Sequence, residues 1–173
     1  NAGHSIGMIS SLSEEELARL VQNSGSPARR NSSTEHLQLS LAAMRDLDAE
    51  GLENALSRSA IMLGVEGFLD NVVVPLIAEL DKGWTEGYVS ISQEHLVSAA
   101  LRTQLDKLRQ SISVPSNAPR ILVTTVAGQY HELGALLVCI AAARCDWNVT
   151  YLGPNLPATE IAAATKRTRS SVI

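Results

Sequence analysis

The chain has 173 residues, of which 45% are hydrophobic, only 3% are aromatic and 18% are charged, and its formal net charge is −4. A core built from Leu, Val, Ile and Ala favours helices and buried parallel strands over an all-β sandwich. The negative charge excludes a general attraction to nucleic acid or to an anionic membrane, so we do not expect these residues alone to form a DNA-binding surface.

The cysteines and the hydropathy of the sequence bear on the cellular compartment. Cys139 and Cys145 lie six positions apart in one helix-like run, a spacing that favours neither a disulfide nor a zinc site. Reduced thiols in a cytosolic protein are the simpler interpretation. No apolar run approaches about 18 residues and no signal peptide is recognisable, so we expect a soluble cytoplasmic protein without a membrane partner.

Residues 1–34 are interpreted as a short helix followed by a linker. Ser13 and Glu16 have the spacing of a capping box, in which the serine hydroxyl bonds the amide three residues on. Residues 22–34 combine Gly, Pro, Asn and several serines around Arg29-Arg30, which is typical of a flexible, solvated linker.

Four amphipathic helices are predicted between residues 35 and 111, with breaks near Asp48, near Gly64 and at residues 83–88. Pro75 is expected to kink the third helix. Short connections favour an antiparallel four-helix bundle. The apolar positions at helical spacing are Leu37, Leu41, Met44 and Leu47; Leu52, Ala55, Leu56, Ala60 and Leu63; Phe68, Val72, Leu76 and Leu80; and Leu96, Ala99, Ala100, Leu105 and Leu108.

The remaining sequence predicts the beginning of an α/β domain. Residues 120–126 have the pattern of a buried strand, residues 133–144 of a helix, and residues 147–152 of a second strand that leads into another helix. This order is typical of a parallel Rossmann-like (flavodoxin-like) sheet, whose ligands bind beyond the carboxyl ends of the strands. Residues 170–173 resemble the opening of a third strand, and two strands with a fragment cannot bury both faces of a sheet. We therefore expect a longer protein, truncated here within this domain.

The loop after the first strand, residues 128–134, contains the side chain best suited to bind a metal. A neutral His131 imidazole at this position can reach out of the sheet toward a ligand. A single histidine at a strand-to-helix turn is also commonly a capping or solvated residue. The loop lacks the GxGxxG spacing of a dinucleotide site. On its own, the loop leaves both interpretations of His131 open.

A second candidate site lies between the third and fourth predicted helices. Trp84 stands between two glycines rather than on a core stripe, and Glu94-His95 opens the fourth helix. Capping alone can explain Glu94, since the helix dipole favours a carboxylate in the first turn, and Trp84 can be an apolar plug. A ring and a carboxylate also suit a ligand with a planar base and a hydroxylated ribose.

Together these motifs resemble the sensor region of the cobalamin-binding MerR-type transcription regulators of the CarH/LitR group. The resemblance covers about residues 35–173. It rests on GQYHELGALL at residues 128–137, on YLGPNLP at residues 151–157, and on Trp84 followed ten and eleven residues later by Glu94-His95. The GHSIG run at the start of the chain, with the acidic helix after it, is similar to the end of a MerR winged helix-turn-helix.

The resemblance implies that adenosylcobalamin lies between a helical bundle, residues 35–115, and a Rossmann-like domain, residues 119–173, while residues 1–34 are the remnant of a DNA-binding domain and its linker. His131 would be the lower axial ligand of cobalt, and Gly134 would leave room for the cofactor's nucleotide tail. Trp84 would pack on the 5′-deoxyadenosyl group. The other residues implied to bind the cofactor are Glu94, His95, Gln129, Tyr130, Glu132, Leu152 and Gly153.

The sequence departs from the family pattern at two positions. Thr85 stands where well-characterised members have a second histidine, which takes the upper cobalt position after light removes the adenosyl group. Gln129 stands where a carboxylate commonly orients and charges the axial imidazole. A bis-histidine photoproduct through residue 85 is therefore not expected, and cobalt ligation should be weaker or less sensitive to pH.

The function implied is that of a light-responsive sensor region without catalytic turnover, in a homo-oligomer, a tetramer by resemblance, that binds operator DNA through a missing N-terminal domain. One alternative is a corrinoid carrier domain of a cobalamin-dependent methyltransferase, although those carriers favour Asp at the position of Gln129. Another is a regulator that has lost cobalamin and acts through protein contacts alone.

Overall fold

The computed structural model describes residues 27–173, with side chains from Thr34 onward. The capping box predicted at Ser13 and Glu16 and the GHSIG run lie outside these residues. Helix α3 (Pro27–Arg45) begins inside the segment predicted as a linker, so the linker prediction is wrong from residue 27 onward. Proline is well tolerated as a first helical residue, because the amide hydrogen it lacks has no intrahelical partner there.

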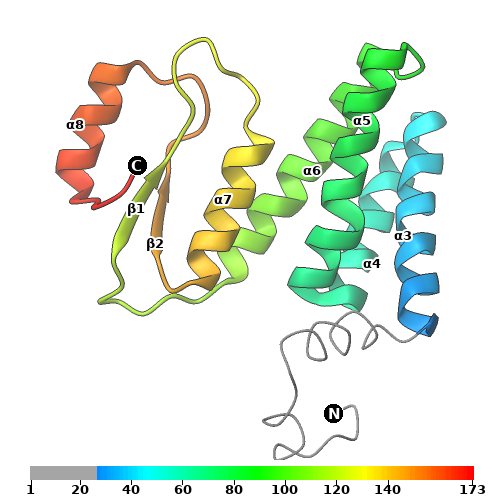
Figure 1. Cartoon of the computed structure of the whole chain (residues 1–173), viewed down its shortest axis with the longest axis horizontal. Coiled ribbons are helices and arrows are strands. Elements are labelled where there is room, and N and C mark those ends of the chain that lie inside the picture. The colour runs from blue at the N-terminus through cyan, green and yellow to red at the C-terminus, as the bar shows by residue number, and fades with distance from the viewer. Residues whose placement is uncertain (1–26) are drawn as a thin grey trace, which may run out of the picture.

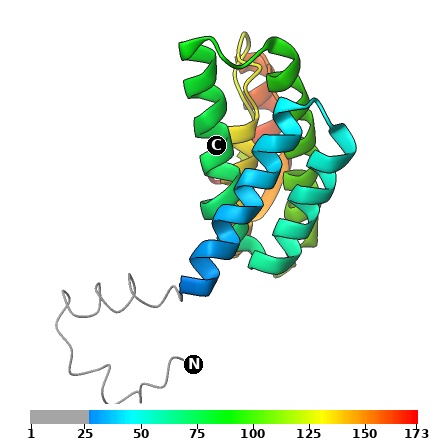
Figure 2. The ribbon, with the colours of Figure 1, turned by 90° about the vertical axis from the view of Figure 1, so that its right-hand side faces the viewer.

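The first part of the chain is helical, and its helices pack side by side (Figures 1 and 2). After α3 come α4 (Ala49–Phe68), a π-helical turn η1 (Leu69–Val73), α5 (Val74–Glu86) and α6 (Ile91–Ser111). The break predicted at Asp48 is the start of α4, where the Asp48 carboxylate accepts a hydrogen bond of 2.9 Å from the amide of Gly51.

Two residues interrupt the long run from α4 to α5. Gly64 has φ 67° and ψ 179° inside α4, which confirms the predicted break there. Pro75 follows η1 in the first turn of α5. Because proline cannot donate to the carbonyl four residues earlier, the ladder of α-helical hydrogen bonds is interrupted at this point. The kink predicted at Pro75 therefore takes the form of one π-helical turn upstream of it.

Most of the predicted core positions are buried. Five are half-buried, and two are exposed: Leu47, whose surface is 50% exposed, and Ala99. Leu47 has φ 53° in the turn after α3 and so leaves the helical face, while Ala99 lies about 100° around α6 from the buried Ala100. The largest fully buried side chains in the core are Phe68, Leu52, Leu56, Leu76, Leu101, Leu105, Leu136, Ile140, Val72, Val73 and Val97.

The second part of the chain is a small parallel sheet. Strands β1 (Arg120–Val123) and β2 (Asn148–Tyr151) pair in parallel, with Arg120 opposite Asn148. Helix α7 (Leu133–Arg144) connects them with the bounds predicted from the sequence. On the other edge of β1, Val172 bridges Ile121 in parallel, as expected for the opening of a third strand. The chain is thus mostly helical with a small parallel sheet.

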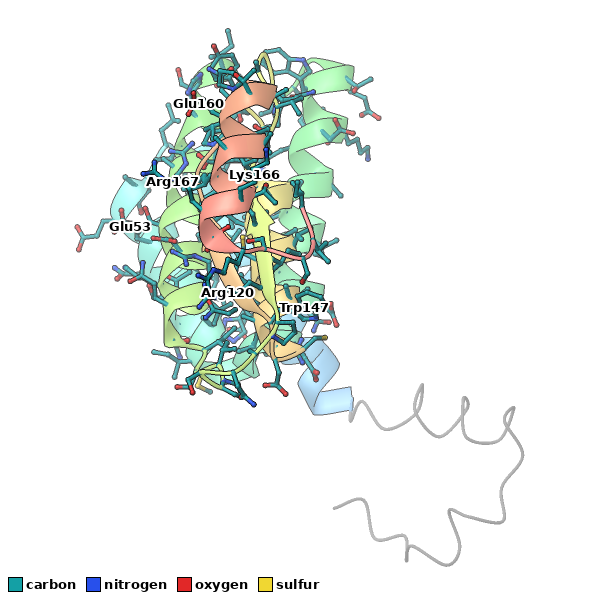
Figure 3. All side chains as sticks on the ribbon, turned by 90° about the vertical axis from the view of Figure 1, so that its left-hand side faces the viewer. Glu53, Arg120, Trp147, Glu160, Lys166 and Arg167 are labelled. Carbon is teal, nitrogen blue, oxygen red and sulfur yellow. The ribbon has the colours of Figure 1, made fainter. Side chains whose placement is uncertain are left out.

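The sheet lies between α7 and α8 (Ala158–Thr168), as Figure 1 shows. Helix α8 is attached at its end by Arg120, whose Nη1 donates a hydrogen bond of 3.0 Å to the carbonyl of Thr168. Figure 3 looks onto this side, with Glu160, Lys166 and Arg167 along α8. Helix α7 packs against α6, and its Leu136 and Ile140 belong to the core of the helical part. One continuous core therefore joins the two parts.

The helical run Ala49–Glu86 is long and apolar enough to cross a membrane, with a mean hydropathy of 1.7 over an 18-residue window. This corrects the expectation that no apolar run approaches that length. The measure averages over charged residues, and Glu66 and Asp70 lie in the middle of the run. Only 22% of that window is buried, although the run contributes Phe68 and Val72 to the core.

The φ and ψ of Gly64 are accessible essentially to glycine alone, so replacing Gly64 by Ala should destabilise the fold by about 1–3 kcal/mol. A Cβ at Gly64 would meet no atom within 4 Å, so the loss reflects backbone strain rather than a clash. Urea unfolding followed by circular dichroism measures it. The control Glu53→Ala, an exposed substitution in α4, should change stability by less than about 0.5 kcal/mol. Equal stability of the two variants would contradict the assigned backbone geometry.

Candidate functional site

The turn between α5 and α6 presents Trp84. Gly87, with φ 79°, ends α5 in the left-handed conformation. Gly83 is buried, and a Cβ there would lie 2.2 Å from the Val89 side chain and 2.7 Å from that of Tyr88, so only glycine permits this close approach. Trp84 is 57% exposed. The interpretation of Trp84 as an apolar plug between helices is therefore wrong.

The first turn of α6 presents Glu94 and His95. Ser90 is the cap, and Gln93 completes a capping box with it: the Gln93 amide donates to the Ser90 hydroxyl, and the Ser90 amide to the Gln93 side chain. Capping therefore does not explain Glu94. Its carboxylate instead accepts a hydrogen bond of 2.6 Å from Ser98 and lies 3.9 Å from Nε2 of the exposed His95.

Two loops meet beyond the carboxyl ends of β1 and β2. The amide of Gly128 donates to Oδ1 of Asn155 at 2.8 Å, and the amide of Asn155 donates to the Thr125 hydroxyl at 2.9 Å. The same hydroxyl donates to the carbonyl of Gln129. These bonds hold the first loop while its His131 side chain stays exposed. His131 is therefore accessible to a ligand on the side of the sheet that the sequence predicted.

The glycines of these loops leave open space. At Gly134, in the first turn of α7, and at Gly153, with φ 77°, a Cβ would meet no atom within 4 Å. The carbonyl of Gly153 accepts a hydrogen bond of 2.7 Å from Thr124, which fixes the second loop. Tyr130 and Leu152 expose much of their apolar surface in the same two loops.

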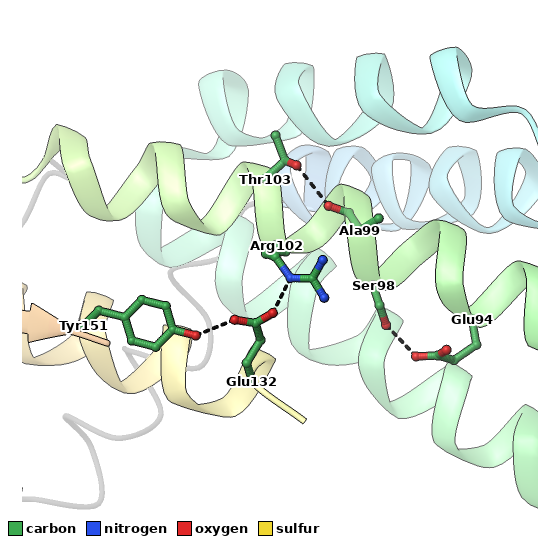
Figure 4. A network of polar contacts seen from close by, with 7 residues as sticks. All are labelled: Glu94, Ser98, Ala99, Arg102, Thr103, Glu132 and Tyr151. Carbon is green, nitrogen blue, oxygen red and sulfur yellow. Dashed lines mark hydrogen bonds and ion pairs between the residues drawn. The ribbon is translucent and has the colours of Figure 1, made fainter. Parts of the chain in front are cut away.

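Glu132 has an environment that the sequence did not indicate. Its side chain is only 11% exposed. One carboxylate oxygen accepts a hydrogen bond from Nε of Arg102 on α6, and the other accepts one of 2.5 Å from the Tyr151 hydroxyl on β2 (Figure 4). We call Arg102, Glu132 and Tyr151 the Glu132 cluster. Burial, followed by the hydrogen bond to Glu132, raises the pKa of Tyr151 above its ordinary value of 10.

The structure brings the two candidate regions to the same end of the molecule without joining them. The α5–α6 turn and the loop after β1 both lie at the upper end in Figures 1 and 2. Among residues 27–173, no hydrogen bond or ion pair joins Trp84, Glu94 or His95 to His131. Two hollows of about 450 and 490 Å³ lie elsewhere, one beside the Glu132 cluster and one on the face of the sheet.

No group of three or more His, Cys, Asp and Glu side chains that could hold a metal ion occurs in the part of the chain that the structure describes. A metal bound by several protein ligands is therefore not supported there. The exposed imidazole of His131 is a single nitrogen donor. It suits a metal whose other coordination positions are filled by a cofactor.

The sequence did not indicate the residues whose hydrogen bonds fix the loops of the candidate site, Asn155 and Arg102. Asn155 has φ 66°, a conformation in which Asn is enriched, and it stands directly after a Gly-Pro pair. That signal could have marked it as a turn residue. Arg102 gave no signal, because 30 positions separate it from Glu132 and its place on α6 is typical of a solvated helix face.

Comparison with known proteins finds one matching family model and two similar repressors. Residues 39–109 match the family model of the B12 binding domain, B12 being cobalamin. The chain is 26% identical over 170 residues to the HTH-type transcriptional repressor CarA of Myxococcus xanthus, and 27% identical over 124 residues to CarH of the same organism. These alignments cover 91% and 72% of the chain but 57% and 41% of the relatives, so the chain spans about half the length of the curated relatives it matches.

A solved structure, the methanol:cobalamin methyltransferase complex MtaBC of Methanosarcina barkeri, aligns with 98% of the chain and 67% of its own at 15% identity, with a TM-score of 0.42. A likeness at that score carries no functional argument. The domain match and the two repressors confirm the predicted resemblance. Residues 39–109 are thus similar to a B12 binding domain, and the chain is similar to two transcriptional repressors of the CarA and CarH type.

Replacing Tyr151 by Phe should destabilise the fold by about 1 kcal/mol at neutral pH, because the Glu132 carboxylate loses a half-buried donor. Because the pKa of Tyr151 is raised in the folded state, its stabilising contribution is complete below pH 10 and is lost as the pH rises through the folded pKa. Urea unfolding of both proteins should therefore show a difference that narrows above about pH 10. A difference in stability that widens above that pH would show that folding lowers the pKa of Tyr151 instead of raising it.

Proposed function

We propose that this chain is the cobalamin-binding sensor region of a transcription regulator. Adenosylcobalamin would lie between a helical bundle, residues 35–115, and a Rossmann-like domain, residues 119–173. The observation that carries the proposal is the match of residues 39–109 to the B12 binding domain, in a chain that exposes His131 at the carboxyl end of β1. The relation to CarA and CarH supports the regulatory role.

The residues below the proposed cofactor fit its chemistry. The corrin ring of cobalamin already surrounds the cobalt, so the protein needs to supply only one axial nitrogen, and His131 is a single exposed donor. The open space at Gly134 and Gly153 leaves room for the nucleotide tail beside the sheet. Gln129, Tyr130 and Leu152 would line the same side of the site.

The residues above the proposed cofactor fit an adenosyl group. Trp84 presents an exposed aromatic face on which a planar base can stack. In the first turn of α6, the Glu94 carboxylate can accept hydrogen bonds from ribose hydroxyls, and the His95 imidazole can donate to them. Because the capping box of Ser90 and Gln93 already completes the helix end, neither side chain is needed for capping.

The response to light would come from the cofactor. When bound, adenosylcobalamin supplies a weak, coloured cobalt–carbon bond, and the protein supplies packing and ligation. Thr85 follows Trp84 where a second histidine would be expected, and its hydroxyl donates a 3.0 Å hydrogen bond to the carbonyl of Asp81 in its own helix. We therefore propose that residue 85 supplies no ligand to the upper position after illumination.

The remaining properties follow from the same proposal. A regulator of this kind would be cytoplasmic, would form a homo-oligomer and would bind operator DNA through an N-terminal domain. The homologous repressors are transcription regulators, so we propose that the chain carries out no catalytic turnover. Loss of the adenosyl group from Trp84 would shift the helical part against the sheet and change the affinity for DNA.

The first test is retention of adenosylcobalamin by the purified chain after gel filtration in darkness. The His131→Ala variant should show the spectrum of cobalt without an axial nitrogen and bind about tenfold more weakly or worse. Ser116→Ala, in the loop before β1 at the opposite end of the strand, should match the original chain. Failure of the chain to retain any cobalamin would refute the proposal and favour a regulator that acts through protein contacts alone.

A second test separates the sensor from a methyl carrier. Trp84→Ala should lower the affinity for adenosylcobalamin by about tenfold, because the stacked ring is lost. Trp84→Phe keeps a ring and should lose less. The affinity for methylcobalamin should hardly change in either variant, as measured by equilibrium dialysis. An original chain that binds both cobalamins equally well would support the corrinoid carrier of a methyltransferase instead.

A further inference from the structure

We propose that Glu132 is a positioning residue that fixes the His131 loop to helix α6, through the Glu132 cluster defined above. This inference rests on the proposed function for what the loop binds. Its structural part concerns this chain alone, and can be tested without any cofactor. It replaces the expectation that Glu132 contacts the cofactor directly.

Both oxygens of the Glu132 carboxylate already have a hydrogen-bond donor. Each of its two oxygens accepts a hydrogen bond, one from Arg102 and one from Tyr151, and only 11% of the side chain is exposed. Its donors come from two different parts of the chain, α6 and β2. A carboxylate held on both sides cannot move independently of either element.

Glu132 also stands at the junction that matters for His131. It directly follows His131 and directly precedes the first residue of α7. Its side chain does not cap that helix, so its role lies in the contacts with Arg102 and Tyr151. One planar peptide unit joins Glu132 to His131. Holding Glu132 in place therefore restrains the end of the loop from which the imidazole projects.

Arg102 connects this junction to the other candidate region. Glu94, Ser98 and Arg102 recur at four-residue intervals and therefore lie along one face of α6. Figure 4 shows this row, with Ser98 bonded to Glu94 at one end and Arg102 bonded to Glu132 at the other. A displacement of α6 by an occupant above Glu94 would thus be carried to the backbone beside His131 by a direct contact.

The charged groups around the cluster are few. Asp106, Lys107 and Arg109 line the same hollow as Arg102, Glu132 and Tyr151. Arg109 is paired with Asp106 at 2.6 Å and lies 6.0 Å from the centre of the Tyr151 ring. Arg102 is therefore the cation that bonds Glu132 directly.

A second Arg–Glu pair between the two parts of the chain provides a control for the loss of the Arg102–Glu132 pair. Arg144 at the end of α7 pairs with Glu66 on α4, a second Arg–Glu pair that joins the two parts of the chain far from the loop. The variants to compare are Arg102→Gln, Glu132→Gln, both together, and Arg144→Gln. Arg102→Lys, which keeps the charge and loses the fixed geometry of the guanidinium, serves as a milder variant should Arg102→Gln fold poorly.

The first measurement is hydrogen exchange of residues 128–136 in the cofactor-free chain. Arg102→Gln and Glu132→Gln should each accelerate exchange by about tenfold, and the double variant should add little to either single change. Arg144→Gln should leave this segment unchanged. Exchange that is the same in Arg102→Gln and Arg144→Gln would overturn the proposal whether or not the chain binds cobalamin.

The second measurement is the fraction of nitrogen-coordinated cobalt in the visible spectrum of chains loaded with adenosylcobalamin at one fixed pH. Positioning predicts that both single variants lower this fraction. An effect of charge alone predicts opposite changes, since removing Glu132 makes the imidazole a weaker donor and removing Arg102 makes it a stronger one. Opposite changes would refute the positioning role, whereas a loss of all binding in the original chain would refute the proposed function instead.

Discussion

The packing of α7 against α6 is the interaction on which the rest of the structure depends. A two-stranded parallel sheet cannot bury both faces by itself, and α7 solves part of this problem by placing Leu136 and Ile140 in the core of the helical part. The same contact determines where the carboxyl ends of the strands lie relative to the α5–α6 turn. The two candidate regions therefore reach the same end of the molecule because one apolar seam orients both of them.

Much of the fold could be predicted from the sequence, because its signals are local. The apolar run of residues 133–144 follows a loop and ends at an arginine, and the structure gives α7 these same bounds. Asp48 and Gly64 marked real breaks because one caps a helix and the other adopts a backbone conformation that other residues avoid. Leu47 was assigned to the core from its spacing, but periodicity cannot show that a helix ends two residues before it.

The candidate site was predictable to a different extent. His131 and Trp84 could be singled out as candidates because each residue type stands in an unusual place, and the structure shows both side chains exposed. Residues that hold those side chains in place could not, because contacts between distant segments leave no periodic trace. Glu132 illustrates the difference: the family resemblance implies only a contact with the cofactor, whereas the structure shows its carboxylate bonded to an arginine from α6 and a tyrosine from β2.

The attachments of α7 have a mechanical consequence. Within the described residues, an Arg–Glu pair joins its beginning to α6 and another joins its end to α4, while apolar side chains hold its middle. A rod about 18 Å long that is clamped at three points resists both rolling and sliding. A movement of the helical part against the sheet would therefore have to strain or break at least one of these three attachments.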